Sequence, residues 1–195
     1  MFPLILVVAL GPLVWCQSPP PLPVWPDGFR TDATVIAFDD ENEPHSHHSI
    51  FYYAYLNVSG RWHGMERHDH IGYCYGWSSN RNCTILITNN VYIVGENNEF
   101  CCMALPGNFG VPRTWLKGAT WLGEEEIFGQ RVNHWYSHDH EYWSRVDEPF
   151  DGVRYSGPNF KTPRQFTNYE KWEKGSQKVG LFDLPADMDC SQPCP

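Results

Sequence analysis

The feature that most constrains the fold is a series of short apolar runs separated by turn residues. Five of these runs are rich in β-branched and aromatic side chains, the composition typical of strands: 34–38, 50–56, 83–88, 91–94 and 131–136. Clusters of Asn, Gly, Ser and Pro punctuate the chain at 57–60, 78–82, 89–90, 95–98 and 106–110. Such turns join neighbouring strands as hairpins. We therefore expect a mainly β domain built as an antiparallel meander.

Helices are expected to be few and short. The apolar period of 3.6 residues that marks an amphipathic helix is not sustained along the chain. Its nearest approach lies between Phe166 and Trp172, where we expect at most a short helix.

The amino terminus has the composition of a secretory leader. Residues 1–16 contain no charged side chain and are dominated by Leu, Val, Ile, Ala and Trp, with cleavage expected after Cys16. A transmembrane anchor needs about 18 or more apolar residues, and Gly11-Pro12 interrupts this run. We therefore predict a signal peptide over 1–16, a proline-rich lead-in over 17–30 and a single β domain over 31–195. The protein is then secreted, or held in the lumen of the secretory pathway, with no transmembrane anchor.

Charge and aromatic content limit the classes of partner. The formal net charge is -9, which disfavours nucleic-acid binding through phosphate neutralisation. A cationic partner or a neutral ligand fits better. The chain also contains 9 Trp, 10 Tyr and 11 Phe, so aromatic rings must fill much of the core or line a cavity.

Six of the seven cysteines remain after the leader, an even number that indicates disulfides in an exported chain: Cys74, Cys83, Cys101, Cys102, Cys190 and Cys194. Cys74 and Cys83 bracket a turn-rich connection and are expected to form a local bridge. Adjacent residues of a strand point to opposite faces, so Cys101 and Cys102 should take different partners. Cys190 and Cys194 are the candidates. The alternative is a thiolate metal site, but the chain lacks the Cys-x-x-Cys spacing typical of zinc.

A glycine and tryptophan pattern in the middle of the chain resembles that of a known group of proteins. It comprises Trp115–Gly123, Gly129 and Asn133–Trp135, with Pro149 and the tail Phe182–Cys190 downstream. The group consists of small secreted proteins and includes the ependymin-related proteins and a plant family of uncharacterised secreted proteins. Its members are similar in fold to bacterial lipoprotein carriers. The resemblance implies a LolA-like, strongly curved sheet, or half-barrel, whose concave face holds an apolar ligand or a partner's chain.

Aromatic residues in and after this pattern are the candidate ligand-binding residues: Trp115, Trp121, Trp135, Tyr142 and Trp143. In an unbroken strand from Arg131, Trp135 and Trp143 share one face and Tyr142 lies on the other. One of the two faces should be concave. The alternative is that each ring simply packs between the sheet and its covering loops.

Two Asp-centred histidine pairs, His68-Asp69-His70 and His138-Asp139-His140, are candidate metal ligands. Residues two apart in a strand project the same way, close enough for two imidazoles to share one ion. If the two pairs lie on adjacent strands, His68, His70, His138 and His140 can form a four-histidine site for Zn or Cu. The alternative is a histidine-rich surface that senses pH.

Catalytic motifs are mostly absent: the chain has no Gly-x-Ser-x-Gly, His-Glu-x-x-His, Walker or Gly-x-Gly-x-x-Gly pattern. Glu124 and Glu126 share a strand face and are a candidate Ca ligand pair, which the ependymin resemblance also implies. The alternative for these residues is a solvated charged edge that discourages aggregation.

Together these features predict a secreted, disulfide-bonded glycoprotein that binds an apolar or amphipathic small molecule in a curved-sheet pocket. The partner in that pocket can also be an extracellular protein or a glycan. One alternative is a structural component of an extracellular matrix or surface assembly, including a homo-oligomer. Another is an extracellular hydrolase that uses the His and Asp pairs.

The two acceptor sequons, Asn57-Val-Ser59 and Asn82-Cys-Thr84, generate the first prediction. An endoglycosidase that removes Asn-linked sugars should shift the mass of protein secreted by a eukaryotic host. An unchanged mass, with Asn57 intact in the peptide map, would remove the glycosylation claim.

Overall fold

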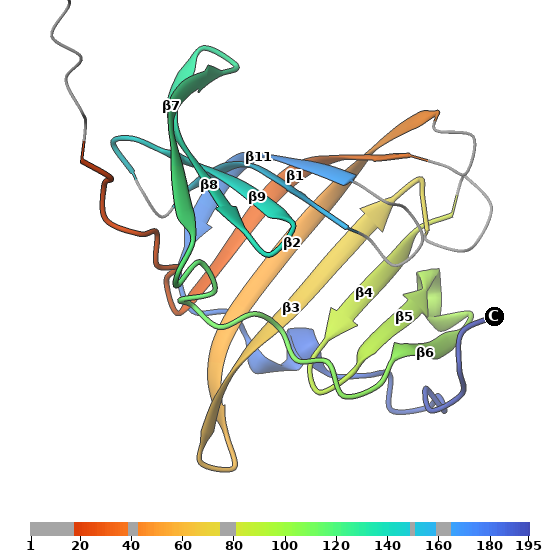
Figure 1. The fold of residues 1–195 in the computed structure, drawn as a ribbon. Coiled ribbons are helices and arrows are strands. Elements are labelled where there is room, and N and C mark those ends of the chain that lie inside the picture. Colours follow the sequence, from red (N-terminus) through yellow and green to blue (C-terminus); the bar gives the residue numbers. More distant parts are fainter. Residues whose placement is uncertain (1–17, 39–42, 75–80, 149–150, 159–164) are drawn as a thin grey trace, which may run out of the picture.

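Eleven strands in the described part of the chain form one antiparallel sheet (Figure 1). The structure, a computed structural model, describes residues 18–38, 43–74, 81–148, 151–158 and 165–195. The predicted signal peptide and Pro149 lie outside these residues. The strands are β1 Gly28–Phe38, β2 Pro44–Val58, β3 Arg61–Ile71, β4 Cys83–Ile87, β5 Val91–Gly95, β6 Cys101–Leu105, β7 Thr120–Ile127, β8 Gln130–Ser137, β9 His140–Arg145, β10 Gly152–Gly157 and β11 Gln165–Lys174. The predicted mainly β, antiparallel architecture is confirmed.

The strand order places the first and last strands together in the middle of the sheet. It runs β6-β5-β4-β3-β2-β1-β11-β10-β9-β8-β7. Two meanders, β1 to β6 and β7 to β11, are therefore joined by the antiparallel pairing of β1 with β11. The outer strands are β6 and β7, so the sheet is an open, curved half-barrel (Figure 1).

Irregular pairing helps to curve the sheet. One extra, unpaired residue interrupts the register at each of four places: Glu170 in β11, Ala104 in β6, Leu122 in β7 and Val153 in β10. A β-bulge bends the strand that carries it and increases its local twist. Because the shifts are distributed over both meanders, the bending is shared along the sheet.

The connection between β6 and β7, residues 106–119, crosses the concave face and approaches β3 closely. Gly64 of β3 and Gly110 of the connection form a backbone bridge. A Cβ atom on Gly64 would overlap the carbonyl group of Val111, so only glycine allows this approach. The lead-in is held to the same connection, because Trp25 N donates to Arg113 O at 3.1 Å and Arg113 Nε donates to Trp25 O at 2.8 Å.

Three disulfides form with the predicted partners. Cys74 bonds to Cys83, Cys101 to Cys190 and Cys102 to Cys194. The side chains of Cys101 and Cys102 enter separate core clusters on the two faces of the sheet, as the alternation of a strand requires.

The C-terminal tail follows β6 along its backbone. Met103 N donates to Gln192 O at 2.7 Å, and Cys194 N donates to Met103 O at 3.1 Å. The two long disulfides attach the same segment, so the tail is part of the fold.

The expected strand from Arg131 through Trp143 is wrong. The chain reverses at His138 and Asp139, whose φ angles of 47° and 66° are left-handed, and this two-residue turn separates β8 from β9. The reversal inverts the face assignment beyond residue 137. Tyr142, not Trp143, therefore shares a face with Trp135.

The possible helix at Phe166–Trp172 is also wrong, because these residues belong to β11. The helices of the described chain are two short 3-10 turns, η1 Glu96–Asn98 and η2 Val179–Phe182. Among the described residues, no helix is long and apolar enough to cross a bilayer.

The two long disulfides close nearly the same loop, with sequence separations of 89 and 92. Removing both should therefore cost more stability than the sum of the two single losses. With one bridge kept, the other closes only a ring of a few residues, and its replacement by serines should cost about 2 kcal/mol. The chain-entropy model gives about 6 to 7 kcal/mol for the loss of both. Urea unfolding of C101S/C190S, C102S/C194S and the four-serine variant measures this. Equal losses from one pair and from both pairs would contradict it.

Candidate ligand-binding pocket

A pocket of about 440 Å³ lies on the concave face, where the crossing connection and the lead-in meet the sheet. Its volume is within the usual range of about 300 to 1,000 Å³ for small-molecule sites. Aromatic residues form part of its wall: Trp25, Phe51, Trp115, Tyr155 and Tyr169. Aliphatic residues form another part: Ala33, Val35, Ile85, Ile87 and Val111. The polar residues are Ser49, Glu66, His68, His70, His140, Gln165 and Thr167.

Trp25 anchors the aromatic wall. Its ring packs edge to face against Phe29, Tyr53 and Trp115, with centroids 5.2, 5.0 and 5.5 Å away. Its Nε1 donates to the hydroxyl of Tyr142 at 3.2 Å, so the ring is fixed in orientation as well as in position. The lead-in thus supplies one wall of the pocket and closes the core cluster beneath it.

Glu66 places a carboxylate at the pocket, with 7% of the residue exposed. One oxygen accepts a hydrogen bond from the backbone N–H of Val111 at 2.7 Å. The other lies 3.3 Å from His68 Nε2, and the His68 ring stacks on Phe51 with centroids 4.3 Å apart. The carboxylate is therefore held by the crossing connection on one side and by β3 on the other.

Two buried histidines meet beside the pocket. His47 Nε2 and His70 Nδ1 are 2.8 Å apart, so one ring donates and the other accepts. Burial, with a smaller contribution from the charge of His48, lowers the pKa of His47 to about 4. Burial also lowers the pKa of His70 well below its usual range, with smaller contributions from His68 and His47. Both imidazoles are therefore neutral near pH 7.

His140 and Tyr155 form the polar pair on the opposite wall. His140 Nδ1 and the Tyr155 hydroxyl are 2.7 Å apart. Burial lowers the pKa of His140, and the charges of Asp139 and His138 act on it in opposite directions. Burial raises the pKa of Tyr155, and the charge of Glu66 raises it further. At neutral pH this wall is uncharged.

Two buried polar atoms of the pocket residues have no hydrogen-bond partner in the described structure. They are Ser49 Oγ, on a residue that is 1% exposed, and Trp115 Nε1. Buried polar groups without a partner are uncommon because each costs free energy. Both residues line the pocket, but these two atoms are enclosed by the protein and are not open to it.

The predicted ligand-binding aromatics separate into three groups. Trp115 lines the pocket. Trp135 and Tyr142 are buried in the core cluster next to it, and Trp121 packs against that cluster while its Nε1 donates to Asn133. Trp143 lies on the other face, in a separate cluster with Val132 and Val153.

Most of the aromatic wall was absent from the prediction: Trp25, Phe51, Tyr155 and Tyr169. Phe51 lies in a predicted strand. The available signal was that Ser49, Phe51 and Tyr53, two residues apart, share one face of that strand. The sequence around Trp25 gave no such signal, because Trp25 lies in the proline-rich lead-in.

The predicted histidine pairs are only partly brought together. His68 and His70 line the same pocket as His140. His138 points elsewhere, with its Nδ1 3.0 Å from Ser137 Oγ in the hairpin turn. The histidine that joins His70 is His47 of the adjacent strand β2. Within the described ranges no group of three or more His, Cys, Asp or Glu side chains is arranged to hold a metal ion.

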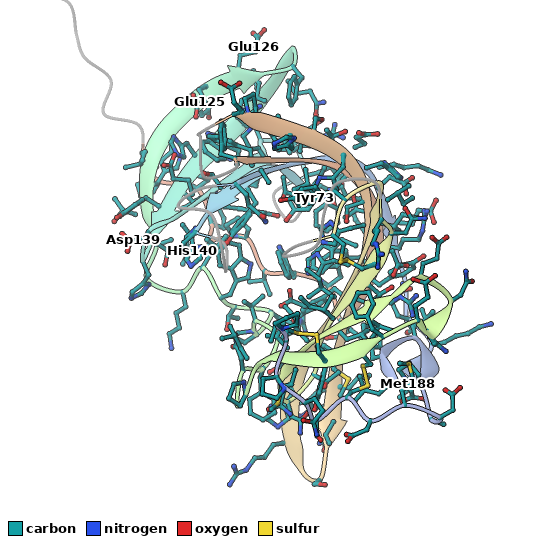
Figure 2. All side chains as sticks on the ribbon, turned by 90° about the vertical axis from the view of Figure 1, so that its right-hand side faces the viewer. Tyr73, Glu125, Glu126, Asp139, His140 and Met188 are labelled. Atoms are coloured by element: carbon teal, nitrogen blue, oxygen red, sulfur yellow. A yellow bond between two sulfur atoms is a disulfide. The ribbon has the colours of Figure 1, made fainter. Side chains whose placement is uncertain are left out.

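Glu124 and Glu126 lie on β7, an outer strand of the sheet. Glu124 pairs with Arg131, and Glu125 lies 3.0 Å from His134. Figure 2 shows Glu125 and Glu126 on the projecting β7–β8 hairpin, far from Met188 in the tail. This placement matches the charged edge considered as the alternative to a Ca site.

The two sequons differ in accessibility. Asn57 is exposed at the β2–β3 turn, where its Oδ1 accepts from Gly60 N. The Asn82 side chain accepts from Gly72 N and donates to Glu96. Asn57 is therefore the better placed acceptor for a glycan.

Comparisons with known proteins yield only distant structural likenesses. No family profile matches the chain, and no curated protein matches it. A DUF1329 family protein from Desulfovibrio piger is similar with a TM-score of 0.41 and 6% identity, over 81% of this chain and 90% of that one. A LolA superfamily protein from Nitrosomonas europaea is similar with a TM-score of 0.37 and 8% identity, over the same shares. At these scores the description of the fold rests on the strand pairings themselves.

The buried histidines predict a stability loss on acidification. Between about pH 6.5 and pH 4, the unfolded chain binds a proton at His47 that the folded chain does not, so the free energy of unfolding falls as pH falls. His47→Gln should flatten this part of the curve. His138→Asn, at an exposed turn residue whose left-handed backbone suits asparagine, serves as the control. Parallel curves for the wild type and His47→Gln, measured by urea unfolding across this range, would contradict the assignment.

Proposed function

We propose that this protein is an exported binding protein that holds an apolar or amphipathic small molecule in the pocket on its concave face. The observation that carries the proposal is the 440 Å³ pocket, whose walls are aromatic and aliphatic with a few polar residues among them. Apolar walls favour a ligand body that leaves water, and the few polar groups fix its orientation.

Export and glycosylation form part of the same proposal. Three disulfides support an oxidising compartment, because such bonds persist in secreted proteins. The exposed sequon at Asn57 supports a glycan at the β2–β3 turn. The resemblance to ependymin-related proteins rests on sequence features, namely the motif of residues 115–135 with Pro149 and the tail Phe182–Cys190 downstream, and we retain it as part of the proposal.

The two alternatives have less support. Assembly through the sheet edges is disfavoured, because the tail pairs with β6 at Met103 and three consecutive glutamates charge β7. A hydrolase that uses the His138 pair would require His138 and Asp139 in a cleft, yet both are exposed in a hairpin turn.

An environment-sensitive apolar dye should bind with roughly micromolar affinity, or about 8 kcal/mol, and quench tryptophan emission. Trp115→Ala removes a wall of the pocket and should weaken binding by about tenfold or more. Ala33→Leu adds bulk inside the pocket and should do the same. Fluorescence titration of each folded variant measures the affinity.

Trp62→Ala provides the matched control, because this ring is 58% exposed and lies outside the pocket. Its dissociation constant should equal that of the wild type. If Trp115→Ala and Ala33→Leu fold and bind the dye as tightly as the control, the ligand does not occupy this pocket.

A further inference from the structure

We infer that the pocket selects a cationic amphipath, with an ammonium head directed to Glu66 and an apolar body against the aromatic wall. This inference rests on the proposed binding function and specifies the chemical class of its ligand. It is carried by the charges and rings that line the pocket.

The charge of the pocket is negative. None of the described lining residues is Lys or Arg, and Glu66 is their only carboxylate. His70 and His140 are neutral near pH 7, because burial lowers the pKa of both. An anionic head would meet the Glu66 carboxylate, beside which the His68 imidazole lies with its Nε2 3.3 Å away, and would find no lysine or arginine among the described lining residues. An ammonium would gain a carboxylate partner. The net charge of -9 acts in the same direction over longer distances.

The aromatic wall adds a second attraction for a cation. The faces of aromatic rings are negative, and they attract a desolvated ammonium placed over them. Trp25, Trp115 and Tyr155 stand edge to face in succession, with centroid separations of 5.5 and 6.2 Å. The Glu66 carboxylate belongs to a residue that lines the same pocket as these rings.

The test compares probes that share one apolar chain and differ in their heads: decyltrimethylammonium, decanol and decanoate, each below its micelle concentration. Tryptophan quenching should show the cation binding at least about tenfold more tightly than the alcohol, and decanoate binding most weakly. Glu66→Gln keeps the size of the side chain and an oxygen that accepts from Val111 N. This substitution should weaken the affinity for the cation by about tenfold and leave the affinity for decanol unchanged. Glu126→Gln, on the outer strand β7, is the matched control.

The outcomes separate this inference from the proposed function. Equal affinities for the three probes, or decanoate binding most tightly, would overturn the choice of a cation while leaving a binding pocket in place. An equal loss for the cation and the alcohol in Glu66→Gln would show that Glu66 acts on pocket shape and would also overturn it. If the folded wild type binds none of the probes, the proposed function itself fails.

Discussion

The crossing of residues 106–119 over β3 is the constraint on which the rest of the structure depends. It requires two glycines, Gly64 and Gly110, because any side chain on Gly64 would meet the carbonyl group of Val111. The same crossing sets the chemistry of the pocket. Val111 N–H fixes the Glu66 carboxylate, Arg113 binds the lead-in at Trp25, and the connection then delivers Trp115 to the wall. One backbone contact thus determines where the charge and the rings lie.

The sequence predicts the architecture well because its signals are local. Alternation and turn residues identify strands. The parity and spacing of the cysteines predict that all six form disulfides, but leave open which of Cys190 and Cys194 bonds to Cys101. The two faces of β8 and β9 were harder to assign. Their order depends on a hairpin turn at His138 and Asp139, which contains none of the glycine or asparagine that usually marks such turns. The candidate aromatics consequently included Trp143, which faces away from the pocket.

The pocket itself was largely hidden from sequence analysis. Strand β3 is rich in polar residues and resembles a surface segment, yet Glu66 and His70 are buried at the concave face. Buried polar residues without apolar alternation break the usual rule for a strand, and such exceptions are expected at functional sites. The contribution of Trp25 depends on a contact 88 residues away in sequence, between Trp25 and Arg113. No local pattern reports such a contact.

The pairing of β1 with β11 has a consequence for the order in which the chain can fold. The strand that emerges first from the ribosome acquires its second neighbour only when residues 165–174 have been made. Each meander can form from neighbouring hairpins, but joining the two halves is a long-range step, which slows folding. Cys101 and Cys102 must likewise wait for Cys190 and Cys194 at the end of the chain. These two thiols thus remain open to mispairing until the last residues of the chain have been made, so a disulfide isomerase should speed oxidative folding.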